Sequence, residues 1–140
     1  MARRRGLRPL VLPDAVLLDS EGLSAAAAGS ARVRAELLLA ERLGAKVHVS
    51  AVTLAETLRG GPRDARVHSL VKSAVPHPVT PGLGRAAGEL LGRTGRADAV
   101  DAIVAVTASG LGQRVRILTS DPDDLRALTA EMDGVSVVAV

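Results

Sequence analysis

Short apolar runs alternate along the chain with longer segments that have helical periodicity. The clearest run, Ala15–Leu18, has four apolar residues in succession with no polar residue between them. A continuous run of this length is typical of a strand that is buried on both faces, as in a parallel sheet covered by helices. We therefore predict an α/β fold with a mostly parallel sheet, flanked by helices on right-handed connections.

Capping residues, glycines and prolines divide the chain into elements. Strands are expected at 15–18, 47–49, 75–79, 115–118 and 135–140, and two prolines confine the third of these to a sheet edge. Helices are expected at 23–28, 31–43, 51–59, 63–72, 81–93, 96–111 and 122–132. This alternation fits one domain over residues 14–140. A basic arm at 1–13 precedes it, which we interpret as a solvated tail, with a phosphate-contacting arm as the alternative.

The segment 96–111 predicts one buried helix. It has no proline, and no glycine before Gly110, which is expected to close the helix as its C-cap. Apolar residues occur on all sides of the helical wheel, which is typical of a helix surrounded by protein. Asp101 falls in its first turn. An ionised carboxylate in such a place needs a cation, an ion partner or several N–H donors.

The composition excludes several kinds of site. The chain has 140 residues, 47% of them hydrophobic, and no cysteine, which excludes disulfides and thiolate metal sites. It also lacks Phe, Tyr and Trp, and its net charge of +3 comes mainly from arginine. Nucleic acid would therefore be held by arginine, backbone donors and metal rather than by aromatic stacking. We expect no membrane span and no signal peptide, and the lack of cysteine fits a reducing cytoplasm.

Four acidic residues are expected to meet at one edge of the sheet. Asp19 and Asp121 follow predicted strands, and Glu56 and Asp101 lie in helices next to the same edge. The carboxyl ends of parallel strands form this edge, where ligands bind to open α/β sheets. Carboxylates brought together in a partly buried site repel one another unless a cation is present. An all-oxygen set without His or Cys fits Mg²⁺ or Mn²⁺, ions that serve phosphoryl chemistry.

Several of these acids also have a purely structural interpretation. Asp19, Asp98 and Asp121 stand where helix N-caps are expected. Asp101 and Asp124 occupy the third helical position after two of these caps, as in a variant capping box. A lone glutamate on a helix is usually just solvated. Only their convergence would distinguish a site from ordinary capping.

Other features have structural interpretations that we prefer. The segment Gly82–Ala87 matches the dinucleotide fingerprint G-x-G-x-x-A, but it follows a short, proline-bounded strand, and we favour packing glycines over nucleotide binding. The three histidines have no ligand spacing, and His48 is expected to be a hydrogen-bonded structural residue. Three arginines cluster near the start of the helix expected at 63–72 and are interpreted as a solvated face, with an RNA phosphate contact as the alternative. They are Arg59, Arg63 and Arg66.

Four segments, in this order, resemble a PIN-domain ribonuclease, and most of all the VapC toxins of type II toxin–antitoxin pairs. They are L-L-D-S, S-A-V-T-L-A-E-T-L, D-A-I-V-A-V-T-A and L-T-S-D-P-D-D-L. The resemblance covers Asp14 to the C-terminus. It implies a five-stranded parallel sheet flanked by helices, a homodimer, and cleavage of RNA that depends on Mg²⁺ or Mn²⁺. It also implies inhibition by a cognate VapB-like antitoxin that lies over the active site.

The resemblance assigns roles to individual residues. The four family acids match Asp19, Glu56, Asp101 and Asp121. The auxiliary residues are Asp98 beside the third acid, Asp124 as an alternative fourth acid, and Thr119 with Ser120 as the polar pair that orients the fourth acid. The chain departs from many relatives in having Leu125 where Phe is common, which we expect to affect packing rather than chemistry.

These inferences combine into one hypothesis. The chain is expected to be an endoribonuclease toxin whose four acids hold one or two divalent ions, with a metal-bound water attacking the phosphodiester. The first alternative is a non-catalytic PIN-like module that binds RNA or a protein without cutting. The second is nucleotide binding at Gly82–Ala87.

Overall fold

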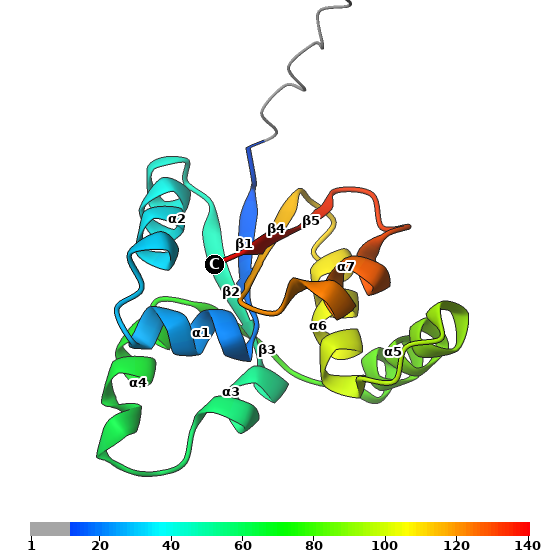
Figure 1. Ribbon diagram of the computed structural model, residues 1–140, viewed down its shortest axis with the longest axis horizontal. Coiled ribbons are helices and arrows are strands. Elements are labelled where there is room, and N and C mark those ends of the chain that lie inside the picture. The colour runs from blue at the N-terminus through cyan, green and yellow to red at the C-terminus, as the bar shows by residue number, and fades with distance from the viewer. Residues whose placement is uncertain (1–11) are drawn as a thin grey trace, which may run out of the picture.

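One parallel sheet forms the centre of the molecule (Figure 1). A computed structural model describes residues 12–140. Its strands are β1 (Ala15–Leu18), β2 (Lys46–Ser50), β3 (Val75–His77), β4 (Val115–Thr119) and β5 (Val135–Ala139). They pair only in parallel, in the order β3-β2-β1-β4-β5. The α/β prediction is confirmed, and β3 lies at a sheet edge as its prolines predicted. Most of the basic arm expected at 1–13 lies outside the described residues.

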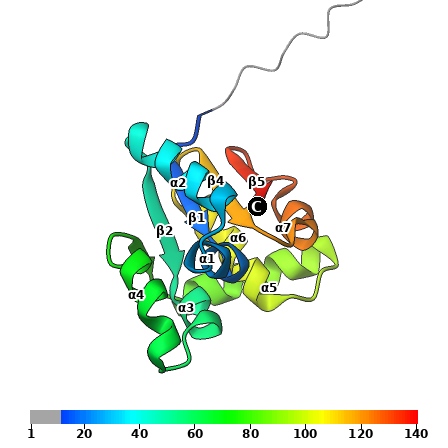
Figure 2. The same ribbon diagram turned by 60° about the vertical axis from the view of Figure 1, so that its left-hand side comes forward.

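Within residues 12–140, seven α-helices and one 3₁₀-helix surround this sheet. They are α1 (Ser20–Ala27), α2 (Ala31–Arg42), α3 (Ala51–Thr57), the 3₁₀-helix Pro62–Asp64, α4 (Ala65–Val71), α5 (Pro81–Thr94), α6 (Ala99–Gly110) and α7 (Pro122–Thr129). Helices α1, α2 and α4 pack against one face of the sheet, and α6 and α7 against the other. Helix α5 lies beside α6 at the periphery (Figures 1 and 2). No helix of this described part is long and apolar enough to cross a membrane.

The central strand β1 divides the core into two halves. All four of its residues are buried. Val16 and Leu18 join the cluster under α1, α2 and α4, whereas Ala15 and Leu17 join the cluster under α6 and α7. Burial on both faces is what a continuous apolar run predicts.

The helix predicted over 96–111 is shorter at its start. Gly95 ends α5 with a left-handed backbone (φ 69°), so residues 96–98 connect two helices. The carboxylate of Asp98 then accepts the N–H of Asp101 at 3.0 Å and caps α6. Gly110 is the last residue of α6 and not its left-handed stop, since Gly112 has that conformation (φ 65°).

Two other expectations need correction. Gly82 and Gly84 lie in the exposed first turns of α5, and a β-carbon on Gly84 would meet nothing within 4 Å, so close packing does not explain that glycine. His48 is only partly satisfied: its Nδ1 lies 2.8 Å from Nε2 of His77, but its own Nε2 is buried without a partner among the described residues.

Candidate active site

The site is built where β1 and β4 end side by side. These strands pair in register, with Leu18 opposite Leu118, so the residues that follow both strands emerge at one edge of the sheet. Asp19 follows β1 directly and is the N-cap of α1. Asp121 follows β4 and stands at the N-cap position of α7. Parallel pairing thus brings together two acids that are distant in sequence.

The four acids predicted from the sequence line one pocket of about 120 Å³. Asp19 and Asp121 come from the ends of β1 and β4, Glu56 from α3, and Asp101 from the first turn of α6. The other lining residues are Ser20, Glu21, Asp98 and Val100. No lysine or arginine is among the residues that line this pocket, so its lining is strongly negative.

Asp19 is the most enclosed acid of the pocket, with 4% of its surface exposed. Burial raises the pKa of its carboxyl, and hydrogen bonds with the Thr119 side chain and the backbone N–H of Gly22 oppose this rise. The bond from the Gly22 N–H is 2.7 Å long and is the α1 cap. Asp19 therefore caps α1 and also lines the pocket.

Asp101 carries the largest electrostatic penalty in the site. Burial and the neighbouring carboxylates of Asp98, Asp19, Asp124 and Asp121 raise its pKa to about 7. A carboxyl with such a pKa is partly protonated at neutral pH unless a cation compensates its charge.

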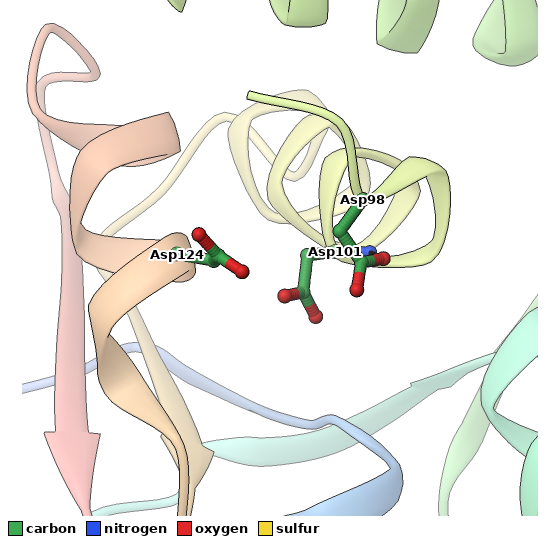
Figure 3. A group of neighbouring side chains, drawn as sticks. All are labelled: Asp98, Asp101 and Asp124. Carbon is green, nitrogen blue, oxygen red and sulfur yellow. Dashed lines mark hydrogen bonds between the residues drawn. The ribbon is translucent and has the colours of Figure 1, made fainter. Parts of the chain in front are cut away.

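The two acids at the start of α7 have different surroundings. Asp121 is exposed, its side chain makes no capping hydrogen bond, and the Thr119 hydroxyl accepts its backbone N–H at 3.1 Å. Asp121 therefore occupies the predicted N-cap position without making the capping hydrogen bond. Asp124 does not line the pocket, although one of its oxygens lies within 4.8 Å of oxygens of Asp98 and Asp101 (Figure 3). Its Oδ1 also accepts a 3.1 Å bond from Arg96.

The donor set fits a hard divalent cation. Every ionisable side chain of the pocket is a carboxylate, and burial together with the neighbouring carboxylates raises the pKa of Asp101. Mg²⁺ and Mn²⁺ prefer oxygen ligands, and Mg²⁺ is usually bound through one or two carboxylates together with several waters. A pocket of about 120 Å³ leaves room for such an ion and part of its hydration shell.

The model of the PIN domain family matches residues 16–130. The chain belongs to the PIN domain family. A comparison with curated proteins finds no match.

Several solved structures share the fold of this PIN domain. VapBC2 of Rickettsia felis, bound to a DNA fragment from its promoter, gives a TM-score of 0.69 at 12% identity, covering 89% of this chain and 98% of that chain. A toxin–antitoxin complex from Klebsiella pneumoniae gives a TM-score of 0.68 at 18% identity, covering 90% of this chain and 100% of that chain. VapBC-5 of Mycobacterium tuberculosis gives a TM-score of 0.55 at 23% identity, covering 91% of this chain and 100% of that chain.

The structure adds Glu21 to the acids of this PIN domain. Glu21 lines the pocket, and its Oε2 accepts a 2.9 Å hydrogen bond from the hydroxyl of Ser120. Ser120 thus contacts Glu21 rather than Asp121. Glu21 was not among the residues predicted from the sequence, although its place two residues after Asp19 was a usable signal.

The three arginines considered as RNA contacts are exposed and do not line the pocket. Arg59 donates to the carbonyl oxygens of Ala55 and Leu58, at 3.2 and 2.8 Å. Arg66 donates to the carbonyl oxygen of Ala27 at 3.3 Å. Arg63 lies in the 3₁₀-helix between them.

Proposed function

We propose that this PIN domain is an endoribonuclease that depends on Mg²⁺ or Mn²⁺ and acts as the toxin of a VapBC-like pair. The observation that carries the proposal is the pocket in which carboxylates from four separate segments meet, with no lysine or arginine among the residues that line it. Membership of the PIN family and the likeness to solved toxin–antitoxin complexes support it.

Asp19, Asp101, Asp121 and Glu56 would hold the ion. When bound, the ion would lower the pKa of a water and neutralise charge on the scissile phosphate. The chain's own contribution is to fix the acids before substrate arrives. Gly22 and Thr119 orient Asp19, while the Asp98 carboxylate holds the backbone N–H of Asp101.

Cleavage of a labelled single-stranded RNA by the purified protein tests the proposal. We expect cutting with Mg²⁺ or Mn²⁺, none with EDTA, and none by Asp19→Asn or Asp101→Asn proteins whose circular dichroism matches that of the wild type. Full activity in both variants would contradict the assignment. RNA binding without any cutting or metal binding by the wild type would favour a non-catalytic PIN module instead.

An apolar groove between α2 and α4 supports the proposal of an antitoxin partner. It has a volume of about 640 Å³ and is lined by Leu37 and Leu70 among others. Leu38, which is 49% exposed, continues this apolar surface, and Arg34 and Arg66 lie at its end near α1. We propose that an apolar antitoxin segment with acidic side chains packs here. Co-purification with the product of a small upstream open reading frame would test it.

A homodimer remains part of the proposal. Light scattering on the purified chain, with and without the antitoxin, would show whether two copies associate.

A further inference from the structure

Arg96 brings a positive charge next to the acidic site. It lies in the connection between α5 and α6, two residues before Asp98, which lines the pocket. Its Nη1 donates a 3.1 Å hydrogen bond to Oδ1 of Asp124, across 28 residues of sequence. The side chains of this pair are 45% and 42% exposed. The guanidinium is therefore fixed at one point and open to solvent elsewhere.

Stability does not explain this ion pair. Exposed pairs of this kind contribute little to folding, because both charges are well solvated when they are apart. The guanidinium has five N–H donors. Within residues 12–140, the bond to Asp124 is the one side-chain hydrogen bond that Arg96 makes. Most of its donors are thus available to another ligand.

Arg96 differs in this respect from the arginines near α3. Arg59 and Arg66 donate to backbone carbonyl oxygens that do not belong to the site. Arg96 instead bonds to an acid whose carboxylate lies within 4.8 Å of those of Asp98 and Asp101. Asp124 thus holds the guanidinium at the rim of the carboxylate cluster.

We propose that Arg96 binds a backbone phosphate of the RNA, and that Asp124 is the residue that positions it rather than a ligand of the metal. This inference rests on the proposed function. A phosphodiester that approaches a pocket lined by carboxylates is repelled unless cations stand nearby. A guanidinium can donate two parallel hydrogen bonds to a phosphate, which fixes the register of the strand. Asp121, which lines the pocket, remains the fourth acid.

The test measures binding of a fluorescein-labelled single-stranded RNA of random sequence, with Ca²⁺ in place of Mg²⁺, over a series of salt concentrations. Arg96→Gln should weaken binding by roughly threefold to tenfold and reduce the slope of log K against log [salt] by about 0.7, as for one lost phosphate contact on a single strand. Arg96→Lys should keep the slope. Arg93→Gln, an exposed arginine at the end of α5, is the matched control and should change both quantities less.

The variant Asp124→Asn distinguishes two effects of Asp124 on RNA binding: its positioning of Arg96 and the repulsion between its negative charge and the RNA. Removing a negative charge near RNA would by itself strengthen binding. We expect the opposite, with a reduced salt slope like that of Arg96→Gln, because an amide oxygen holds the Arg96 guanidinium less firmly than a carboxylate does. Titration of the RNA-free protein with Mn²⁺ should give the wild-type affinity for Asp124→Asn, whereas Asp121→Asn should lower it.

Two results would overturn the inference. One is a salt slope in Arg96→Gln equal to that of Arg93→Gln. The other is a loss of Mn²⁺ affinity in Asp124→Asn with a gain in Arg96→Gln, which would make Asp124 a ligand and Arg96 its competitor. The RNA-binding measurement needs no cutting. A changed salt slope in a protein that never cuts RNA would therefore refute the proposed nuclease activity and support phosphate binding by Arg96. Normal cutting with an unchanged salt slope would support the nuclease activity and refute phosphate binding by Arg96.

Discussion

A β-carbon on Gly22 would collide with the carbonyl oxygen of Leu118. Helix α1 therefore lies directly on the end of β4, where the chain turns toward Asp121. The same contact holds Asp19, the cap of α1, beside Thr119. This close approach lies beside the pocket that Asp19 and Asp121 both line.

Replacing Gly22 should therefore damage both fold and site. We expect Gly22→Ala to lower the free energy of unfolding by about 1–3 kcal/mol, the usual cost of overpacking. Gly88→Ala is the control, since Gly88 lies in α5 with open space around it. That change should raise stability by about 0.5–1 kcal/mol through helix propensity. Equal responses of the two variants in urea denaturation would contradict the contact.

Metal binding should depend on Asp19 and should be visible in thermal unfolding. At an Mn²⁺ concentration about 100 times the dissociation constant, the wild type should gain about 2.7 kcal/mol of stability. Asp19→Asn should lose most of this gain, because its amide cannot supply the charge that the ion needs. Asp133→Asn, an exposed acid outside the pocket, should keep it. A full Mn²⁺ response in Asp19→Asn would remove that residue from the ligand set.

Asp101 should make metal-free stability depend on pH in a definite direction. Its pKa is about 7 in the folded protein, against an ordinary value of 3.8. Its contribution to stability is therefore complete below the ordinary value and is lost as the pH rises through 7. Asp101→Asn has no such group, so its stability relative to the wild type should increase between about pH 4 and pH 7.

The comparison of Asp101→Asn with the wild type cancels other titrations. His48, for example, has a pKa lowered by burial and acts in the opposite direction in both proteins. Saturating Mg²⁺ should reduce the difference at pH 7, since the ion compensates the charge of Asp101. A pH-independent difference between the two metal-free proteins would refute the raised pKa.

The groove between α2 and α4 gives a prediction for the partner. If the proposed antitoxin packs there, Leu38→Glu should weaken its binding tenfold or more, on the order of a central interface residue, because the change places a charge in an apolar contact. Leu39→Glu is the matched control, since Leu39 is 36% exposed on the same helix and lines neither the groove nor the apolar surface by which Leu38 continues it. Isothermal titration with the antitoxin measures both. Equal losses in the two variants would place the partner elsewhere.

The sequence was sufficient to predict the parallel sheet and the meeting of four acidic residues at one edge of it. The apolar run of β1 and the edge prolines of β3 are local signals, and parallel strands necessarily end at one edge. It was not sufficient at the start of α7. Asp121 and Asp124 both fit a capping pattern, and the contact that distinguishes them is the bond of Asp124 to Arg96, which lies 28 residues away in the sequence.

Two exposed charged residues near the pocket were also not predicted from the sequence. Glu21 and Arg96 lie on turns and helix starts, where periodicity carries no information. The start of α6 was placed too early for a related reason. Its limit is set by the left-handed Gly95 and by the cap on Asp98, and not by the apolar pattern of the helix.

The strand order has a consequence during synthesis. Strand β1 is made first, yet one of its neighbours, β4, comes from near the end of the chain. A ribosome that has translated two thirds of the message has produced Asp19 and Glu56 but neither Asp101 nor the strand that brings Asp121 to them. A truncated or still-growing chain therefore has an incomplete carboxylate site, and whatever that site binds can be bound only once β4 has joined the sheet.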